Sequence, residues 1–208
     1  KYKASKAVPF MIYANDFDNS GTQDIVLSYD NNGDYYPVRG RECSSQQMPG
    51  IKKQFPSYDA FGKAKLVDIY GDKLKESVHY AAQDFSSVIL KNTGDGFEII
   101  TLPIEAQFSS VQGIVVEDFD KDGTEDILLA GNFFVSEVET GRADASIGLF
   151  LKGDGDFKFT PELTKDCGFY APADVRDLKL LQGTDGLSRI IVGNNNSRTQ
   201  MFTINNKK

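Results

Sequence analysis

Short apolar runs recur along the whole chain, and clusters of glycine, asparagine and aspartate separate them. The runs are rich in Ile, Val, Phe and Tyr, which favour strands. They cover residues 10–14, 25–29, 88–90, 97–102, 114–116, 127–130, 147–151, 175–181, 190–192 and 201–204. Short strands joined by tight turns are typical of an all-β sandwich, barrel or propeller.

One segment has a helical pattern instead. Ser57 and Asp59 can cap a helix, and apolar residues then recur at roughly helical spacing as far as Leu74. Gly71 supplies a stop before a second short turn. We therefore expect a short helical insertion over about 55–77, packed on a β scaffold.

The chain also contains internal repeats. Residues 11–27 align without a gap on residues 113–129, and each copy is an acidic loop between two apolar runs. A third copy, 175–194, keeps both runs but has a shorter loop in place of the acidic loop. Residues 92–97 match 152–157 as a hairpin turn. The repeat unit is strand, acidic loop, strand, strand, turn, strand.

Four strands in each repeat are typical of a propeller blade. The expected blades are 8–102, which includes the helical insertion, 111–160, and an incomplete 173–208. Residues 1–208 are thus predicted to be one partial, all-β propeller domain of about three four-stranded blades. Closed propellers need about four to eight blades, so we expect the rest of a longer propeller chain, or self-association, to complete it.

Residues that can offer an oxygen ligand stand at alternate positions of both acidic loops. In the first loop they are Asp16, Asp18, Ser20, Thr22 and Asp24, and in the second they are Asp118, Asp120, Asp122, Thr124 and Asp126. Positions one, three, five and nine offer a side-chain oxygen, and the threonine at position seven offers its backbone carbonyl. Calcium takes about six to eight oxygen ligands, and alternate residues of a turning loop can point inwards together. A glycine at the sixth position permits the sharp turn. Both loops are therefore predicted calcium sites.

The context of these loops differs from that of an EF-hand. An EF-hand needs a bidentate Glu at the twelfth position and a flanking helix, whereas these loops have Leu27 and Leu129 there, inside apolar runs. They are predicted to be strand-to-strand calcium loops. Ser20 replaces a carboxylate, so we expect the loop over 16–24 to bind Ca²⁺ more weakly than the loop over 118–126.

The motif Asp-Phe-Asp-x-Asp/Ser-Gly-x-x-Asp-Ile before an apolar strand resembles the FG-GAP or VCBS repeat, the blade unit of integrin-α-like β-propellers. Beyond the motif, further segments resemble the C-terminal part of bacterial VCBS-repeat proteins that often carry an ASPIC/UnbV region. These segments are 55–58, 102–107, 130–132, 139–144 and 171–178. The resemblance implies a calcium-stabilised propeller segment in an exported, periplasmic or cell-surface protein, with a binding or scaffold role. Because the third repeat lacks the acidic loop, no calcium is expected there.

Composition narrows the classes of partner. The 208 residues are 40 % hydrophobic and 25 % charged, as in a folded soluble protein. The formal charge of −7 argues against holding a polyanion, so nucleic acid is not an expected partner. No apolar stretch is long enough to span a membrane as a helix.

Few residues suit nucleophilic or multi-histidine chemistry. The single histidine, His79, lies in a predicted strand, and one histidine cannot build a multi-histidine metal site. Cys43 and Cys167 could pair or remain two separate thiols. No catalytic residue is assigned.

A charged loop in the second repeat is a candidate ligand surface. It carries Glu137, Glu139, Arg142 and Asp144, which could bind a partner or could only order a long loop through arginine–carboxylate pairing.

The favoured function is a non-catalytic module that binds a protein or another ligand, or acts as a scaffold. The alternatives are a carbohydrate-active enzyme or glycan-binding module that uses carboxylates outside the calcium loops, and a segment that only completes an oligomer or a longer chain.

Overall fold

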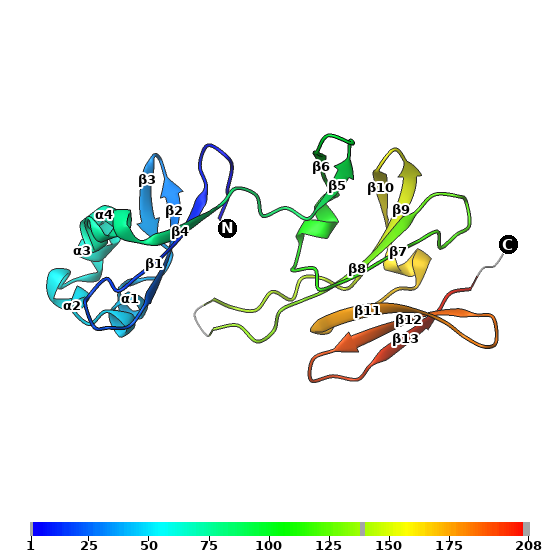
Figure 1. The fold of residues 1–208 in the computed structure, drawn as a ribbon. Coiled ribbons are helices and arrows are strands. Elements are labelled where there is room, and N and C mark those ends of the chain that lie inside the picture. Colours follow the sequence, from blue (N-terminus) through cyan, green and yellow to red (C-terminus); the bar gives the residue numbers. More distant parts are fainter. Residues whose placement is uncertain (1, 138–139, 206–208) are drawn as a thin grey trace. The chain divides into compact units, whose positions relative to one another are not determined.

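The computed structural model describes residues 2–137 and 140–205, and the chain divides into two compact units between Phe85 and Ser86 (Figure 1). The structure is mainly sheet, with 38 % of residues in strands and 17 % in helices. The four sheets are antiparallel, which confirms the prediction of an all-β chain at this coarse level.

The first unit is built on one four-stranded sheet in the order β3-β2-β1-β4. Its strands are β1 (Phe10–Asn15), β2 (Asp24–Asn31), β3 (Asp34–Pro37) and β4 (Val78–Ala82). β1 and β2 form a hairpin whose last pair is Asn15 with Asp24, so the first acidic loop closes this hairpin.

Five short helices cover this sheet between β3 and β4. They are α1 (Arg41–Gln47), α2 (Ile51–Gln54), α3 (Tyr58–Lys63), α4 (Leu66–Tyr70) and α5 (Lys73–Glu76). As the sequence predicts, Ser57 caps α3, its hydroxyl accepting from Ala60 N at 3.1 Å, and α4 ends at Gly71 with φ 59°. The helical segment nevertheless begins at Arg41, earlier than the predicted 55–77.

The early helix α1 has no apolar periodicity because it buries serines. Ser44 and Ser45 are each 5 % exposed, and their hydroxyls donate to the carbonyl oxygens of Arg39 and Arg41 at 3.3 and 2.5 Å. Buried hydroxyls are usually hydrogen-bonded, as both of these are. A hydrophobicity pattern cannot reveal such a helix.

The second unit begins with a hairpin and a single 3₁₀ turn, continues into a four-stranded sheet, and ends in a three-stranded sheet. The elements are β5 (Val88–Asn92), β6 (Phe97–Thr101), η1 (Ile104–Gln107), β7 (Gly113–Glu117), β8 (Asp126–Ala130), β9 (Leu149–Gly155), β10 (Lys158–Glu162), α6 (Thr164–Cys167), β11 (Val175–Gln182), β12 (Ser188–Asn194) and β13 (Gln200–Thr203). The sheet orders β10-β9-β8-β7 and β11-β12-β13 are both meanders.

The strands of the three expected blades are distributed unequally over the sheets. The four strands β7 to β10 cover the expected blade 111–160, with β10 extending two residues beyond it, and three strands lie within 173–208. Within 8–102, β4 pairs with the free edge of β1, while β5 and β6 form a separate hairpin in the second unit. The helices return the chain to β1 rather than to β3, so this segment does not form a single meander.

The last two sheets enclose the largest apolar core of the second unit. β11 packs on β7, and the shared core is a cluster of buried side chains. Its members include Val115, Leu128, Phe169, Val175, Leu178, Ile190 and Val192. The second acidic loop stands at one end of this core, because Phe119 from the loop packs against it.

None of the helices in the described residues is a candidate for a membrane span. Across residues 2–137 and 140–205, the structure contains no helix that combines the length and the apolar character needed to cross a bilayer.

Candidate metal centres

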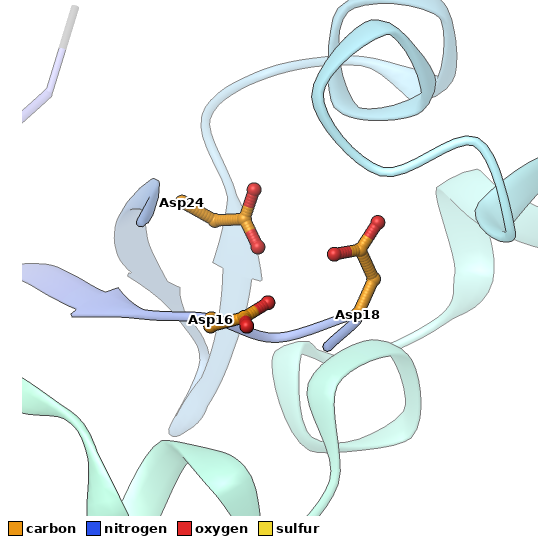
Figure 2. A group of neighbouring side chains, drawn as sticks. All are labelled: Asp16, Asp18 and Asp24. Atoms are coloured by element: carbon orange, nitrogen blue, oxygen red, sulfur yellow. The ribbon is translucent and has the colours of Figure 1, made fainter. Parts of the chain in front are cut away.

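The first acidic loop brings three carboxylates together. Asp16 directly follows β1, Asp18 lies in the loop, and Asp24 begins β2. Figure 2 shows the three side chains converging between the end of β1 and the start of β2. One carboxylate oxygen of each residue lies within 4.8 Å of the others. This spacing suits several oxygens around one cation.

The second loop repeats the arrangement between β7 and β8. One oxygen from each of Asp118, Asp120 and Asp126 lies within 4.8 Å of the others. In the described part of the chain, carboxylates group in this way only at the two loops. Positions one, three and nine of both motifs therefore meet, as the sequence predicts.

Both loops also have the same backbone shape. The fourth position has a positive φ in each, 61° at Asn19 and 63° at Lys121. The sixth position has φ 86° at Gly21 and 92° at Gly123, where a side chain would be strained. The two loops are thus structural repeats as well as sequence repeats.

Backbone amides hold the first carboxylate of each loop in place. Asp16 accepts from the N–H groups of Ser20 and Gly21 at 2.9 and 2.8 Å, and Asp118 accepts from the corresponding N–H groups of Asp122 and Gly123 at 3.1 and 3.0 Å. The hydrogen bond from Gly21, followed by that from Ser20, lowers the pKa of Asp16. This ligand is therefore positioned and ionised before any cation arrives.

The last carboxylate of each loop is buried. Asp24 is 2 % exposed and Asp126 is 0 % exposed. Asp24 accepts from Phe17 N at 2.9 Å, while Asp126 accepts from Phe119 N at 3.0 Å and Gly153 N at 2.8 Å. Burial raises the pKa of both carboxyls, since it disfavours their charged forms. A bound cation would compensate a buried negative charge at this position.

Gly153 lets β9 pass directly beneath the second loop. A Cβ atom on Gly153 would lie 2.2 Å from the carbonyl oxygen of Glu125, a distance that no side chain tolerates. The close approach allows Gly153 N to reach Asp126. The sequence marks this segment only as a hairpin turn, so its role in the site was missed.

A lysine neighbours each loop, and the two lysines make different contacts. Lys152 Nζ, from β9, pairs with Asp120 and lies 3.1 Å from Asp122 Oδ2. These two carboxylates raise the pKa of Lys152. Lys73 Nζ, from α5, instead donates to the backbone oxygen of Asp16 at 2.8 Å and to Asn19 Oδ1 at 2.6 Å. Two carboxylates of the second loop are therefore already paired with a positively charged side chain of the protein, Lys152.

The side chain at the fifth position of each loop also helps to hold the turn. Asp122 Oδ1 accepts from Thr124 N at 2.9 Å, and Ser20 Oγ accepts from Thr22 N at 3.3 Å. Asp122 is not part of the three-carboxylate group. In this structure the fifth and seventh positions thus shape the turn.

The third repeat has a turn that is held by an ion pair. Between β11 and β12, the Arg189 guanidinium contacts both oxygens of Asp185, with Nη1 3.0 Å from Oδ1 and Nη2 at Oδ2. This guanidinium holds the pKa of Asp185 well below its usual range. In this turn, the positive charge that pairs with the aspartate is therefore the Arg189 side chain.

We expect Asp185→Asn to lower the melting temperature at pH 7 equally in Ca²⁺ and in chelator. A carboxyl with a lowered pKa stabilises the fold above its unfolded value of about 4, and this contribution is lost as the pH falls through the folded pKa. The difference between variant and wild type should therefore shrink as the pH falls below about 4. Thermal melts at several pH values would measure it, and a calcium-dependent difference would contradict it.

The charged loop after β8 is ordered partly by its own residues. Arg142 Nε lies 3.2 Å from Asp144 Oδ2, and the guanidinium lies 5.1 Å from the ring centre of Phe134. Glu137 is exposed in the same loop. Glu139, also expected at this candidate ligand surface, lies outside the described residues. The Arg142–Asp144 pair matches the alternative in which such pairing orders the loop.

The remaining reactive side chains are outside the two groups of three carboxylates. His79 is in β4, where Nδ1 lies 3.2 Å from the carbonyl oxygen of Ser77 and the ring lies 5.9 Å from that of Tyr13. Cys43 and Cys167 are both free thiols in the structure.

The fold and these loops define a class of protein in which antiparallel sheets carry strand-to-strand acidic loops able to hold a metal ion. Comparisons with protein-family models, curated proteins and solved structures gave no significant match to this chain. The candidate site is therefore argued from its own geometry.

Proposed function

We propose that this chain is a calcium-stabilised segment of a β-propeller with a non-catalytic binding or scaffold role. The observation that carries the proposal is the repetition of one geometry in two places. Both loops group three carboxylates within 4.8 Å and share positive φ angles at the same two positions. A solvated acidic turn has no reason to recur with the same ligand geometry.

The donor set favours calcium over other metals. All grouped ligands are carboxylate oxygens, which hard cations prefer, whereas zinc and copper favour histidine nitrogen and cysteine sulfur. Magnesium requires near-ideal octahedral geometry and keeps several waters. A loop of alternating oxygens with backbone carbonyls nearby suits the larger and more adaptable coordination of calcium.

The sheet arrangement supports the propeller part of the proposal. β7 to β10 form a four-stranded meander, β11 to β13 form the first three strands of another, and β11 packs on β7. The resemblance to FG-GAP and VCBS repeats points the same way and suggests an exported or surface protein. Closed propellers need about four to eight blades, so we propose that further chain or a second copy completes the propeller.

Calcium is expected to raise the melting temperature of the chain. At a ligand concentration of about 100 times Kd, binding to the folded state adds about 2.7 kcal/mol to the free energy of unfolding, which is a shift of several degrees. Asp120→Ala should lose more of this shift than Ser20→Ala, since Asp120 belongs to a three-carboxylate group. Scanning calorimetry in Ca²⁺, Mg²⁺ and chelator would measure the shift.

The magnesium melt serves as the control for general ionic stabilisation. A smaller shift in Mg²⁺ than in Ca²⁺ at equal concentration is expected. An identical melt in chelator and in millimolar Ca²⁺ would refute the proposed function.

A further inference from the structure

The second unit contains a cavity of about 530 Å³ beside the second acidic loop. It opens at the end of the core that β8 and β9 share with β12 and β13, and α6 borders it. Its volume falls in the range of about 300–1,000 Å³ that is usual for small-molecule sites. The cavity is made entirely within one compact unit.

The corresponding space in the first unit is filled. There, Phe17 from the first acidic loop packs on Tyr70 of α4, with ring centres 5.0 Å apart, and Tyr70 is buried in the helical core. In the second unit, Phe119 occupies the same position of its loop, packs on Phe150 at 5.7 Å, and lines the cavity. Among the described residues of the second unit, only the short helix α6 borders this space, so the same loop borders a core in one unit and an open cavity in the other.

Aromatic rings form much of the cavity wall. Two ring pairs face it, Phe119 with Phe150 and Phe169 with Phe202, and the second pair is T-shaped with centres 5.0 Å apart. Leu128 lies deeper and is 5 % exposed. Ring faces carry partial negative charge and attract cations.

The charged groups at the cavity are of one sign. Asp120, Glu162 and Asp166 line it, and no lysine or arginine is among its described lining residues. Asp120 is engaged by Lys152, and Asp166 lies 3.6 Å from Lys165 Nζ. Glu162, at the end of β10, is therefore the carboxylate best placed to meet a ligand charge.

We propose that this cavity binds a small organic cation, with an apolar body among the phenylalanine rings and an ammonium group near Glu162. Ring faces and a carboxylate both favour a positive charge, whereas an anion would meet three carboxylates. The apolar wall supplies the hydrophobic contribution to binding. The proposal does not depend on calcium, because none of the contacts that it uses requires a bound metal.

A series of three ligands of the same shape tests the proposal. The probes are 4-phenylbutylammonium, 4-phenylbutanol and 4-phenylbutyrate, titrated into the full chain by ligand-observed NMR in chelator. The ammonium compound should bind about tenfold more tightly than the alcohol, corresponding to about 1.4 kcal/mol, and the carboxylate should bind least.

Two variants locate the binding site. Glu162→Gln should bring the affinity for the ammonium compound close to that for the alcohol, while Glu98→Gln, on β6 away from the cavity lining, should change neither. Cys167→Phe should weaken all binding by filling the cavity that Cys167 lines. Circular dichroism and melting curves would establish that each variant is folded.

The outcomes separate clearly. No binding by any probe, equal binding of ammonium and alcohol, or an ammonium affinity that is unchanged in a folded Glu162→Gln variant would each overturn the proposal. Since the titrations contain chelator, failure here leaves the calcium proposal standing, and failure of calcium binding leaves this one standing.

Discussion

Replacing Asp126 with alanine is expected to remove calcium binding at the second loop and to lower the free energy of unfolding by about 2 kcal/mol even in chelator. Asp126 is fully buried and accepts backbone hydrogen bonds from Phe119 and Gly153. Its loss removes the acceptor of the buried Gly153 N–H, and a buried donor left without its acceptor costs about 1–3 kcal/mol. Relief of a buried negative charge offsets part of that cost.

Denaturant unfolding with and without Ca²⁺ would measure both effects of Asp126→Ala. Asp156→Asn is the matched control, because it removes an exposed carboxylate from the nearby β9–β10 turn, where asparagine tolerates the φ of 48°. Asp126→Asn should fall between, since its single amide oxygen can still accept one hydrogen bond. Wild-type stability and an unchanged calcium response in Asp126→Ala would contradict the assigned role.

The same carboxyl gives a pH dependence whose sign calcium should reverse. Burial raises the pKa of Asp126 above its unfolded value of about 4. In chelator, its contribution to stability is present below about pH 4 and is lost as the pH rises through the folded pKa. In the presence of Ca²⁺, which binds the ionised carboxylate, the free energy of unfolding should instead increase as the pH rises through the folded pKa.

Replacing Lys152 with methionine is expected to raise the calcium affinity of the second loop by about tenfold. The Lys152 ammonium lies on Asp120 and Asp122, so calcium must displace it or bind beside another positive charge. Two positive charges a few ångströms apart repel each other, and this repulsion opposes calcium binding. Methionine keeps the length and apolar stem of the side chain without the charge.

The Lys152 variant should also be less stable than the wild type in chelator, because the carboxylates of Asp120 and Asp122 then lose the positive charge that compensates them. Lys158→Met, on the exposed side of the adjacent strand β10, is the control for loss of one positive charge. Calorimetric titration would give both affinities. An unchanged or lower affinity in Lys152→Met would show that the lysine does not compete with calcium.

The short-range part of the candidate site was predictable from the sequence, whereas the long-range part was not. The spacing of Asp118, Asp120 and Asp126 is enough to predict that they meet, because a turn of this length returns the chain on itself. Lys152 and Gly153 reach the loop through the pairing of β9 with β8, which depends on the whole sheet. No local sequence pattern predicts that Lys152 and Gly153 lie beside the second loop.

In the fold too, pairing between neighbouring segments was predictable from the sequence, whereas pairing between distant segments was not. The apolar runs before and after each acidic loop predicted the hairpins of β1 with β2 and of β7 with β8. The pairing of β4 with β1 was missed, because it is set by how the helices return the chain. α1 was missed because hydrogen-bonded serines replace apolar residues on its buried face.

The number of calcium ions bound to each chain tests the central claim most directly. Equilibrium dialysis or calorimetric titration at up to about 1 mM free Ca²⁺, within the range of extracellular calcium modules, would count them. The expected result is two ions on the wild type, one each on Asp24→Ala and Asp126→Ala, and none on the double variant. A wild-type chain that binds no calcium under these conditions would contradict the proposed function.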